Sequence, residues 1–132
     1  MNLAKTNKKR PFFLIFEPEV RTVDGIKALL IGHGYQYQIV DSAESVLNEA
    51  LRDDVMGIIL GDRLPDITPP LLIQRIQDIN RTYPIPVLLL TRSSFAGSIQ
   101  VKMPTPFWLL KPITETGLLK QIAEMKKVVL KK

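Results

Sequence analysis

Five short strand-like runs, separated by longer segments, constrain the fold of this chain more than any other feature. They cover residues 12–16, 35–40, 55–60, 87–90 and 107–110. Most of these runs are continuously apolar, which is typical of strands buried on both faces of a sheet. Strands that alternate with helices predict an α/β fold, with a doubly wound, five-stranded parallel sheet of strand order 2-1-3-4-5.

The segments between the strands carry helix signals of unequal strength. Apolar residues recur at helical spacing over residues 20–30, 46–51, 72–79 and 118–129. Thr68 and Thr114 stand at N-cap positions before the last two of these helices. The stretch 93–102 has only a weak helical pattern with a glycine in its middle, and Pro104 and Pro106 cannot continue it. We therefore expect the fourth helix to be short or distorted.

Composition excludes several classes of function. The chain has no cysteine and one histidine, which excludes disulfide frameworks, thiol catalysis, cysteine-ligated zinc and multi-histidine metal sites. Its 132 residues fit a single domain. No apolar run approaches the roughly 20 residues that span a bilayer, and no signal peptide is recognisable. We therefore expect a cytoplasmic protein.

The net charge of +5 is concentrated at the two ends of the chain. Residues 1–10 carry four basic side chains and no acidic one, and residues 120–132 carry five lysines and one glutamate. We divide the chain into a basic N-terminal tail, residues 1–10, and one domain, residues 11–130. Basic ends can contact nucleic acid, but two solvated termini are the simpler interpretation.

Function in a parallel α/β sheet is expected at the carboxyl ends of its strands. The residues that follow the five predicted strands are Glu17-Pro18, Asp41-Ser42, Gly61-Asp62, Thr91-Arg92 and Lys111-Pro112. A flavin is the least expected ligand, because the Glu-Pro-Glu sequence after the first strand would repel its phosphate.

These strand ends and the segments around them resemble the receiver domains of response regulators. Residues 13–35 look like the first strand and helix of that family, and residues 58–67 look like its third strand and the loop that follows. Residues 86–91 and 108–112 look like its fourth and fifth strands. The resemblance covers residues 11–130. It implies a flavodoxin-like sheet and a role in two-component signal transduction or phosphorelay, without enzymatic activity.

The resemblance also implies roles for particular residue types. In receiver domains an aspartate at the end of the third strand is phosphorylated, and two acidic residues after the first strand hold Mg²⁺. A lysine then pairs with the phosphoryl oxygens, while a threonine and an aromatic residue act as a switch. The matching switch-type residues here are Thr91, Trp108, Lys111 and Pro112. Simpler interpretations are a hydroxyl bonded to backbone for Thr91 and a half-buried strand aromatic for Trp108.

The chain departs from the family pattern at the centre of that chemistry. Glu17 and Pro18 stand where the acidic pair belongs, and proline offers no ligand atom. Counting back four residues from Pro65 puts Gly61 at the acceptor position, and glycine cannot be phosphorylated. Glu17 and Asp62 are then the remnant of an acidic site, with no metal and no cofactor expected. The sequence predicts a pseudo-receiver.

Asp62 leaves an alternative open. If the loop after the third strand is one residue shorter than usual, Asp62 becomes the acceptor and weak Mg²⁺ binding follows. The chain would then be a conventional single-domain phosphoreceiver. Otherwise we expect Asp62 to pair with Arg63 or Lys111, and Glu17 to pair with Lys111.

The Lys111-Pro112 pair supports a geometric prediction. The resemblance implies a cis peptide bond there, which would direct the lysine ammonium toward Glu17 and the space left by Gly61. We expect Lys111 to be held by Glu17, Asp62 or both. As a partly exposed pair, this contact would contribute roughly 0–1 kcal/mol to stability.

The leading prediction for function is a phosphorylation-independent signalling module of a two-component-type pathway. It would be a monomer or weak dimer, and it would act by protein–protein interaction with a kinase or an effector. The first alternative is the conventional phosphoreceiver that uses Asp62. The second is a nucleic-acid-associated protein that uses the Lys-rich ends without sequence specificity. No contact with a membrane is expected.

Overall fold

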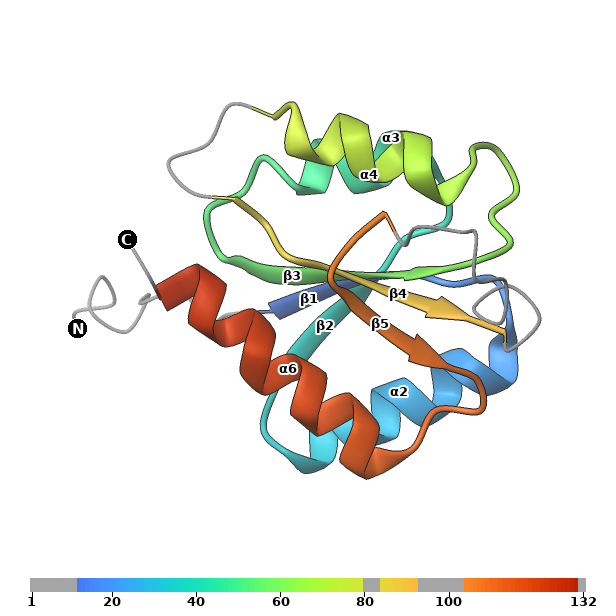
Figure 1. Cartoon of the computed structure of the whole chain (residues 1–132), viewed down its shortest axis with the longest axis vertical. Coiled ribbons are helices and arrows are strands. Elements are labelled where there is room, and N and C mark those ends of the chain that lie inside the picture. The colour runs from blue at the N-terminus through green and yellow to red at the C-terminus, as the bar shows by residue number, and fades with distance from the viewer. Residues whose placement is uncertain (1–11, 80–83, 93–103, 131–132) are drawn as a thin grey trace, which may run out of the picture.

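A computed structural model describes residues 12–79, 84–92 and 104–130 of the chain (Figure 1). In chain order its elements are β1 (Phe12–Phe16), α2 (Val20–Gly32), β2 (Gln36–Ile39), α3 (Ala43–Glu49), β3 (Val55–Gly61), α4 (Pro69–Gln77), β4 (Val87–Thr91), β5 (Phe107–Leu110) and α6 (Glu115–Leu130). The basic tail, residues 1–10, and the predicted short helix over 93–102 lie outside the described residues.

The five strands form one parallel sheet with the order β2-β1-β3-β4-β5. This confirms the predicted doubly wound topology. Helices α3 and α4 cover one face of the sheet, and α2 and α6 cover the other (Figure 1). Crossovers between parallel strands are right-handed, so α2, which leads from β1 to β2, lies on the opposite face from α3 and α4, which lead in the other direction along the sheet. Among the described residues, no helix is long and apolar enough to cross a bilayer.

Two apolar layers form the core, one on each side of the sheet. Side chains of successive strand residues point to opposite faces. In β1, Leu14 and Phe16 therefore pack toward α3 and α4, while Phe13 and Ile15 pack toward α2 and α6. Every residue of β1 is buried, as its continuously apolar sequence predicts. The two layers make the central strands a rigid support for the residues that follow them.

The two threonines predicted to cap helices agree with the structure in part. Thr114 caps α6 as predicted, because its hydroxyl accepts the backbone N–H of Gly117 at 3.1 Å. Thr68 stands at the N-cap of α4, with Pro69 at the first helical position, but its side chain makes no capping hydrogen bond. Strand β3 also extends one residue further than predicted, through Gly61. The added residue, Gly61, is the one that the sequence places at the acceptor position.

Candidate functional site

The candidate site lies at the carboxyl edge of the sheet, where four neighbouring strands end. Glu17 follows β1, Asp62 follows β3, Arg92 follows β4 and Lys111 follows β5. The parallel register brings these ends together, and the backbone N–H of Lys111 donates to the carbonyl of Thr91 at 2.8 Å. The expected convergence of strand ends is therefore confirmed for these strands.

Lys111 is the centre of the cluster. Its Nζ lies 2.9 Å from Glu17 Oε1, 3.1 Å from Glu19 Oε1 and 3.5 Å from Asp62 Oδ1. The predicted cis Lys111–Pro112 bond is present, and the lysine is held by both predicted acids. The pair is more buried than the predicted, partly exposed one, because the Lys111 side chain is only 9% exposed.

Glu17 is the most buried member of the cluster. Its side chain is 2% exposed, and its two oxygens have different neighbours. Oε1 faces Lys111, whereas Oε2 accepts the backbone N–H of Glu19 at 2.9 Å. The predicted Glu17–Lys111 pair is confirmed, and the second contact fixes the orientation of the carboxylate.

The Glu17 carboxylate lies directly against Gly61. A Cβ atom on residue 61 would fall 2.5 Å from Oε1, 2.7 Å from the carboxyl carbon and 2.8 Å from Oε2 of Glu17. Carbon and oxygen atoms that are not bonded do not approach so closely. The space that was expected to be left open by Gly61 is therefore occupied by a carboxylate that comes from the neighbouring strand β1.

Asp62 is bound by Arg92. The Nη1 atom of Arg92 lies 2.9 Å from both Asp62 oxygens, and the backbone N–H of Arg92 donates to Oδ2 at 3.2 Å. Lys111 is a more distant neighbour. The predicted alternative partner Arg63 is thus replaced by Arg92, which the sequence marked as a strand-end residue without assigning it a partner.

Glu19 is the site residue that sequence reasoning missed. It lies at the N-cap of α2, accepts the Thr22 hydroxyl at 2.6 Å and pairs with Lys111. The hydrogen bond from Thr22, and then the hydrogen bond and charge of Lys111, hold the pKa of Glu19 below its ordinary value. The signal for it was the Glu-Pro-Glu sequence, which places two carboxylates two residues apart after β1.

The charge state of Lys111 follows from two opposing effects. Burial acts to lower the pKa of the ammonium, whereas hydrogen bonds to Glu17 and Glu19, with their charges and that of Asp62, act to raise it. The acidic partners prevail, and the pKa of Lys111 lies above its ordinary value of 10.5. The cluster therefore keeps its ammonium at neutral pH.

Alkaline pH should weaken this contribution to stability. Because the folded state raises the pKa of Lys111, the stabilisation is fully present below the ordinary pKa and is lost as pH rises through the folded-state pKa. Urea unfolding of the wild type and of Lys111→Met should therefore differ by a constant amount between about pH 7 and pH 9. The difference should shrink above about pH 10.5. A difference that is unchanged at strongly alkaline pH would contradict the assigned pKa direction.

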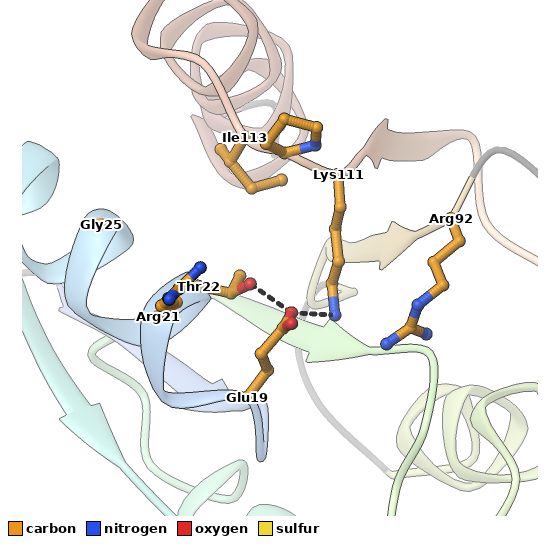
Figure 2. Close-up of a pocket in the computed structure, with 8 residues that line it drawn as sticks. Glu19, Arg21, Thr22, Gly25, Arg92, Lys111 and Ile113 are labelled. Atoms are coloured by element: carbon orange, nitrogen blue, oxygen red, sulfur yellow. Dashed lines mark hydrogen bonds and ion pairs between the residues drawn. The ribbon is translucent and has the colours of Figure 1, made fainter.

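A pocket of about 460 Å³ opens beside the cluster, between α2 and the segment that joins β5 to α6 (Figure 2). Lys111 reaches across it toward Glu19, and Arg92 extends from the end of β4. The residues that line the pocket are Glu19, Arg21, Thr22, Gly25, Arg92, Lys111, Pro112 and Ile113.

Comparisons with known proteins agree with the geometry. No protein-family model matches the sequence, and a search of curated proteins finds no match. Among solved structures, a sensor protein from Polaromonas sp. JS666 superimposes with a TM-score of 0.78 and 23% identity, over 91% of this chain and 98% of that one.

Two further solved structures that superimpose on this chain are described as receiver domains. The receiver domain of the Saccharomyces cerevisiae response regulator Ssk1, co-crystallised with the histidine phosphotransfer protein Ypd1, gives a TM-score of 0.76 at 19% identity, over 92% of this chain and 94% of that one. A CheY-like receiver domain from Methylobacillus flagellatus gives 0.73 at 19% identity, over 89% and 99%. The chain has the receiver fold.

In this receiver fold, the switch-type residues differ in exposure. The hydroxyl of Thr91 is buried and has no hydrogen-bond partner among the described residues, so the simpler interpretation of a bond to backbone is wrong. Trp108 is 37% exposed on β5, which agrees with a strand aromatic that has one edge at the surface.

The residues present do not fit the Mg²⁺ ion that receiver domains hold. Magnesium requires near-octahedral oxygen ligation. Pro18 contributes no side-chain ligand, both Glu17 oxygens have other neighbours, and Arg92 binds both oxygens of Asp62. Within the described parts of the chain, no group of three or more acidic, histidine or cysteine residues is arranged to hold a metal ion.

Proposed function

We propose that this chain is a receiver-type signalling module that acts by contact with a protein partner and does not depend on phosphorylation. The observation that supports this most strongly is the position of the Glu17 carboxylate against Gly61. At the position that matches the phosphoacceptor, the chain has a glycine, and its space holds a carboxylate already paired with Lys111. The position has no acceptor group, and a side chain placed there would overlap the Glu17 carboxylate unless that carboxylate moved.

The state of Lys111 gives further support. Receiver chemistry requires a lysine ammonium that can bind phosphoryl oxygens. Here the ammonium contacts three carboxylates and is largely buried. A phosphoryl group would have to displace these contacts before it could reach the lysine.

A conventional phosphoreceiver that uses Asp62 is the alternative. Asp62 directly follows β3 and lies 3.5 Å from Lys111 Nζ, which favours this function. Phosphorylation requires one carboxylate oxygen to attack the phosphorus atom of a donor. Both Asp62 oxygens accept hydrogen bonds from Arg92, which reduces their nucleophilicity. We therefore favour a structural role for Asp62.

A signalling module without an acceptor must act through its surface. The yeast receiver domain that superimposes on this chain was crystallised with a histidine phosphotransfer protein. By analogy, we propose that this chain binds a kinase, a phosphotransfer protein or an effector in the cytoplasm. Edge strand β5 exposes the apolar side chains of Trp108 and Leu110, which are available for such a contact.

The experiment is treatment with a small phosphodonor such as acetyl phosphate in the presence of Mg²⁺, followed by intact-mass measurement. We expect the mass to stay unchanged. Asp62→Asn, treated identically, is the matched control. A phosphoryl adduct on the wild type that is absent from Asp62→Asn would overturn the proposal and establish the alternative.

Amide NMR covers the case of an adduct too short-lived for mass measurement. Beryllofluoride with Mg²⁺ mimics a phosphorylated aspartate without turnover. We expect no chemical-shift changes around Gly61, Asp62 and Lys111. Saturable shifts at these residues that disappear in Asp62→Asn would contradict phosphorylation independence.

A further inference from the structure

Three carboxylates converge on a single positive atom in this site. Oxygens of Glu17, Glu19 and Asp62 lie 2.9, 3.1 and 3.5 Å from Lys111 Nζ. They come from two separate segments, the turn after β1 and the residue after β3. Oxygen ligands neutralise a hard divalent cation in the same way, although no group of acidic side chains in the described parts of the chain is itself arranged to hold a metal ion. Here the positive atom belongs to a side chain of the same molecule.

We infer that the Lys111 ammonium takes the place of a divalent cation in this cluster and makes the site independent of metal. The inference deepens the proposed function and rests on it, since a module that is not phosphorylated has no need of a metal to neutralise a phosphoryl group. The site therefore fails to fit Mg²⁺ for two reasons. Pro18 removes a ligand, and the Lys111 ammonium already supplies the positive charge that the carboxylates need.

The charges of the cluster support the replacement of a divalent cation by Lys111. The cluster contains three carboxylates and two cations, Lys111 and Arg92, which leaves one excess negative charge. Removal of the lysine charge would leave two, which is the charge that a divalent cation neutralises. With the lysine present, a divalent cation would have to lie next to an ammonium, and the two positive charges would repel each other.

The surroundings of the carboxylate oxygens also support the replacement of a divalent cation by Lys111. Glu17 Oε1 already lies against the ammonium, and its Oε2 is engaged by the backbone N–H of Glu19. Both side chains are largely buried, and the ammonium lies 2.9 Å from Glu17 Oε1, so a cation that bound this oxygen would lie directly beside the lysine. Arg92 neutralises Asp62 from the other side. Each oxygen of Glu17 and Asp62 already lies against an ammonium, a guanidinium or a backbone N–H, so an incoming cation would have to share or displace these contacts.

The experiment compares thermal unfolding of the full chain with Mg²⁺, Mn²⁺ or a chelator, at matched ionic strength and without any phosphodonor. The wild-type melting temperature should not change with either cation. Lys111→Met should be less stable in chelator and should recover part of the loss, saturably, when Mg²⁺ or Mn²⁺ is added. A cation-dependent rise in the wild type, or the lack of any rise in the variant, would overturn the inference.

Two further variants keep the test decisive. Lys111→Gln retains a polar side chain of similar length, and it replaces Lys111→Met if the latter does not fold in chelator. Adding Glu19→Gln, an exposed position, to either variant should abolish the recovery. If neither lysine variant folds with or without cation, Mn²⁺ broadening of wild-type amide signals decides. Selective broadening around Glu17 and Asp62 overturns the inference, and its absence supports it.

The outcomes separate this inference from the proposed function. If the wild type binds a cation but forms no phosphoryl adduct, Lys111 does not take the place of a divalent cation. The proposal of phosphorylation independence then still stands. A phosphoryl adduct on Asp62 overturns the proposed function whatever the melting temperatures show.

Discussion

Replacing Lys111 with methionine should lower the free energy of unfolding by about 3–5 kcal/mol. The substitution leaves the Glu17 carboxylate, 2% exposed, without its counter-charge, and breaking a buried ion pair from one side has a cost of about this size. This is a large share of the stability of a small domain. Urea unfolding at neutral pH, with a chelator present, measures the change.

A second variant separates the ion pair from simple loss of packing. Glu17→Gln combined with Lys111→Met removes both charges and keeps the shape of the buried side chain. This double variant should regain at least half of the loss, because no uncompensated charge remains. A loss below about 1 kcal/mol for Lys111→Met alone is the value of an exposed pair. Such a result would mean that the lysine is solvated.

Gly61→Asp should also be strongly destabilising, by about 3 kcal/mol or more. Its Cβ would overlap the Glu17 carboxylate, and its own carboxylate would add a second negative charge beside the first. Gly61→Ala is the matched control that adds only the Cβ. It should lose about 1–3 kcal/mol, as overpacked core positions do.

Whether Gly61→Ala raises or lowers the free energy of unfolding shows whether the Glu17 carboxylate is held in place. Alanine in a strand is normally favoured over glycine, since glycine loses more backbone entropy on folding. If Gly61→Ala proves neutral or stabilising in urea unfolding, the Glu17 side chain can move aside at little cost. The carboxylate would then not be held in place by Lys111 and the backbone N–H of Glu19.

The strands could be predicted from the sequence because their apolar residues leave few alternatives. The run at 12–16 is apolar at every position, which requires burial on both faces and hence a central strand of a parallel sheet. The edge strand β2 is half exposed, and its predicted ends at 35 and 40 are each one residue too wide. Strand β5 is equally exposed, but its predicted ends at 107 and 110 agree with the structure, so exposure alone does not explain the difference at β2.

The site could be predicted only in part. The pairing of Glu17 with Lys111 follows from two strand ends on one edge of the sheet. The role of Glu19 depends on the extended backbone at the N-cap of α2, which turns its side chain back toward the lysine. No pattern in the sequence specifies that turn.

The contact between Glu17 and Gly61 could not be predicted either. It depends on the extra residue at the end of β3 and on the direction of a side chain from a neighbouring strand. The sequence marked Gly61 as the loss of an acceptor. Only the packing of β1 against β3 reveals that a different carboxylate has filled the same space.

A double-mutant cycle between Glu17→Ala and Gly61→Asp measures directly whether the two side chains compete for one space and one ammonium. If they do, the double variant moves the carboxylate from β1 to β3 and keeps a partner for Lys111. It should then be more stable than Gly61→Asp alone, with a coupling energy of about 2 kcal/mol or more in urea unfolding. Additive losses, with no coupling beyond about 0.5 kcal/mol, would contradict the assignment of the Glu17 carboxylate to the acceptor position.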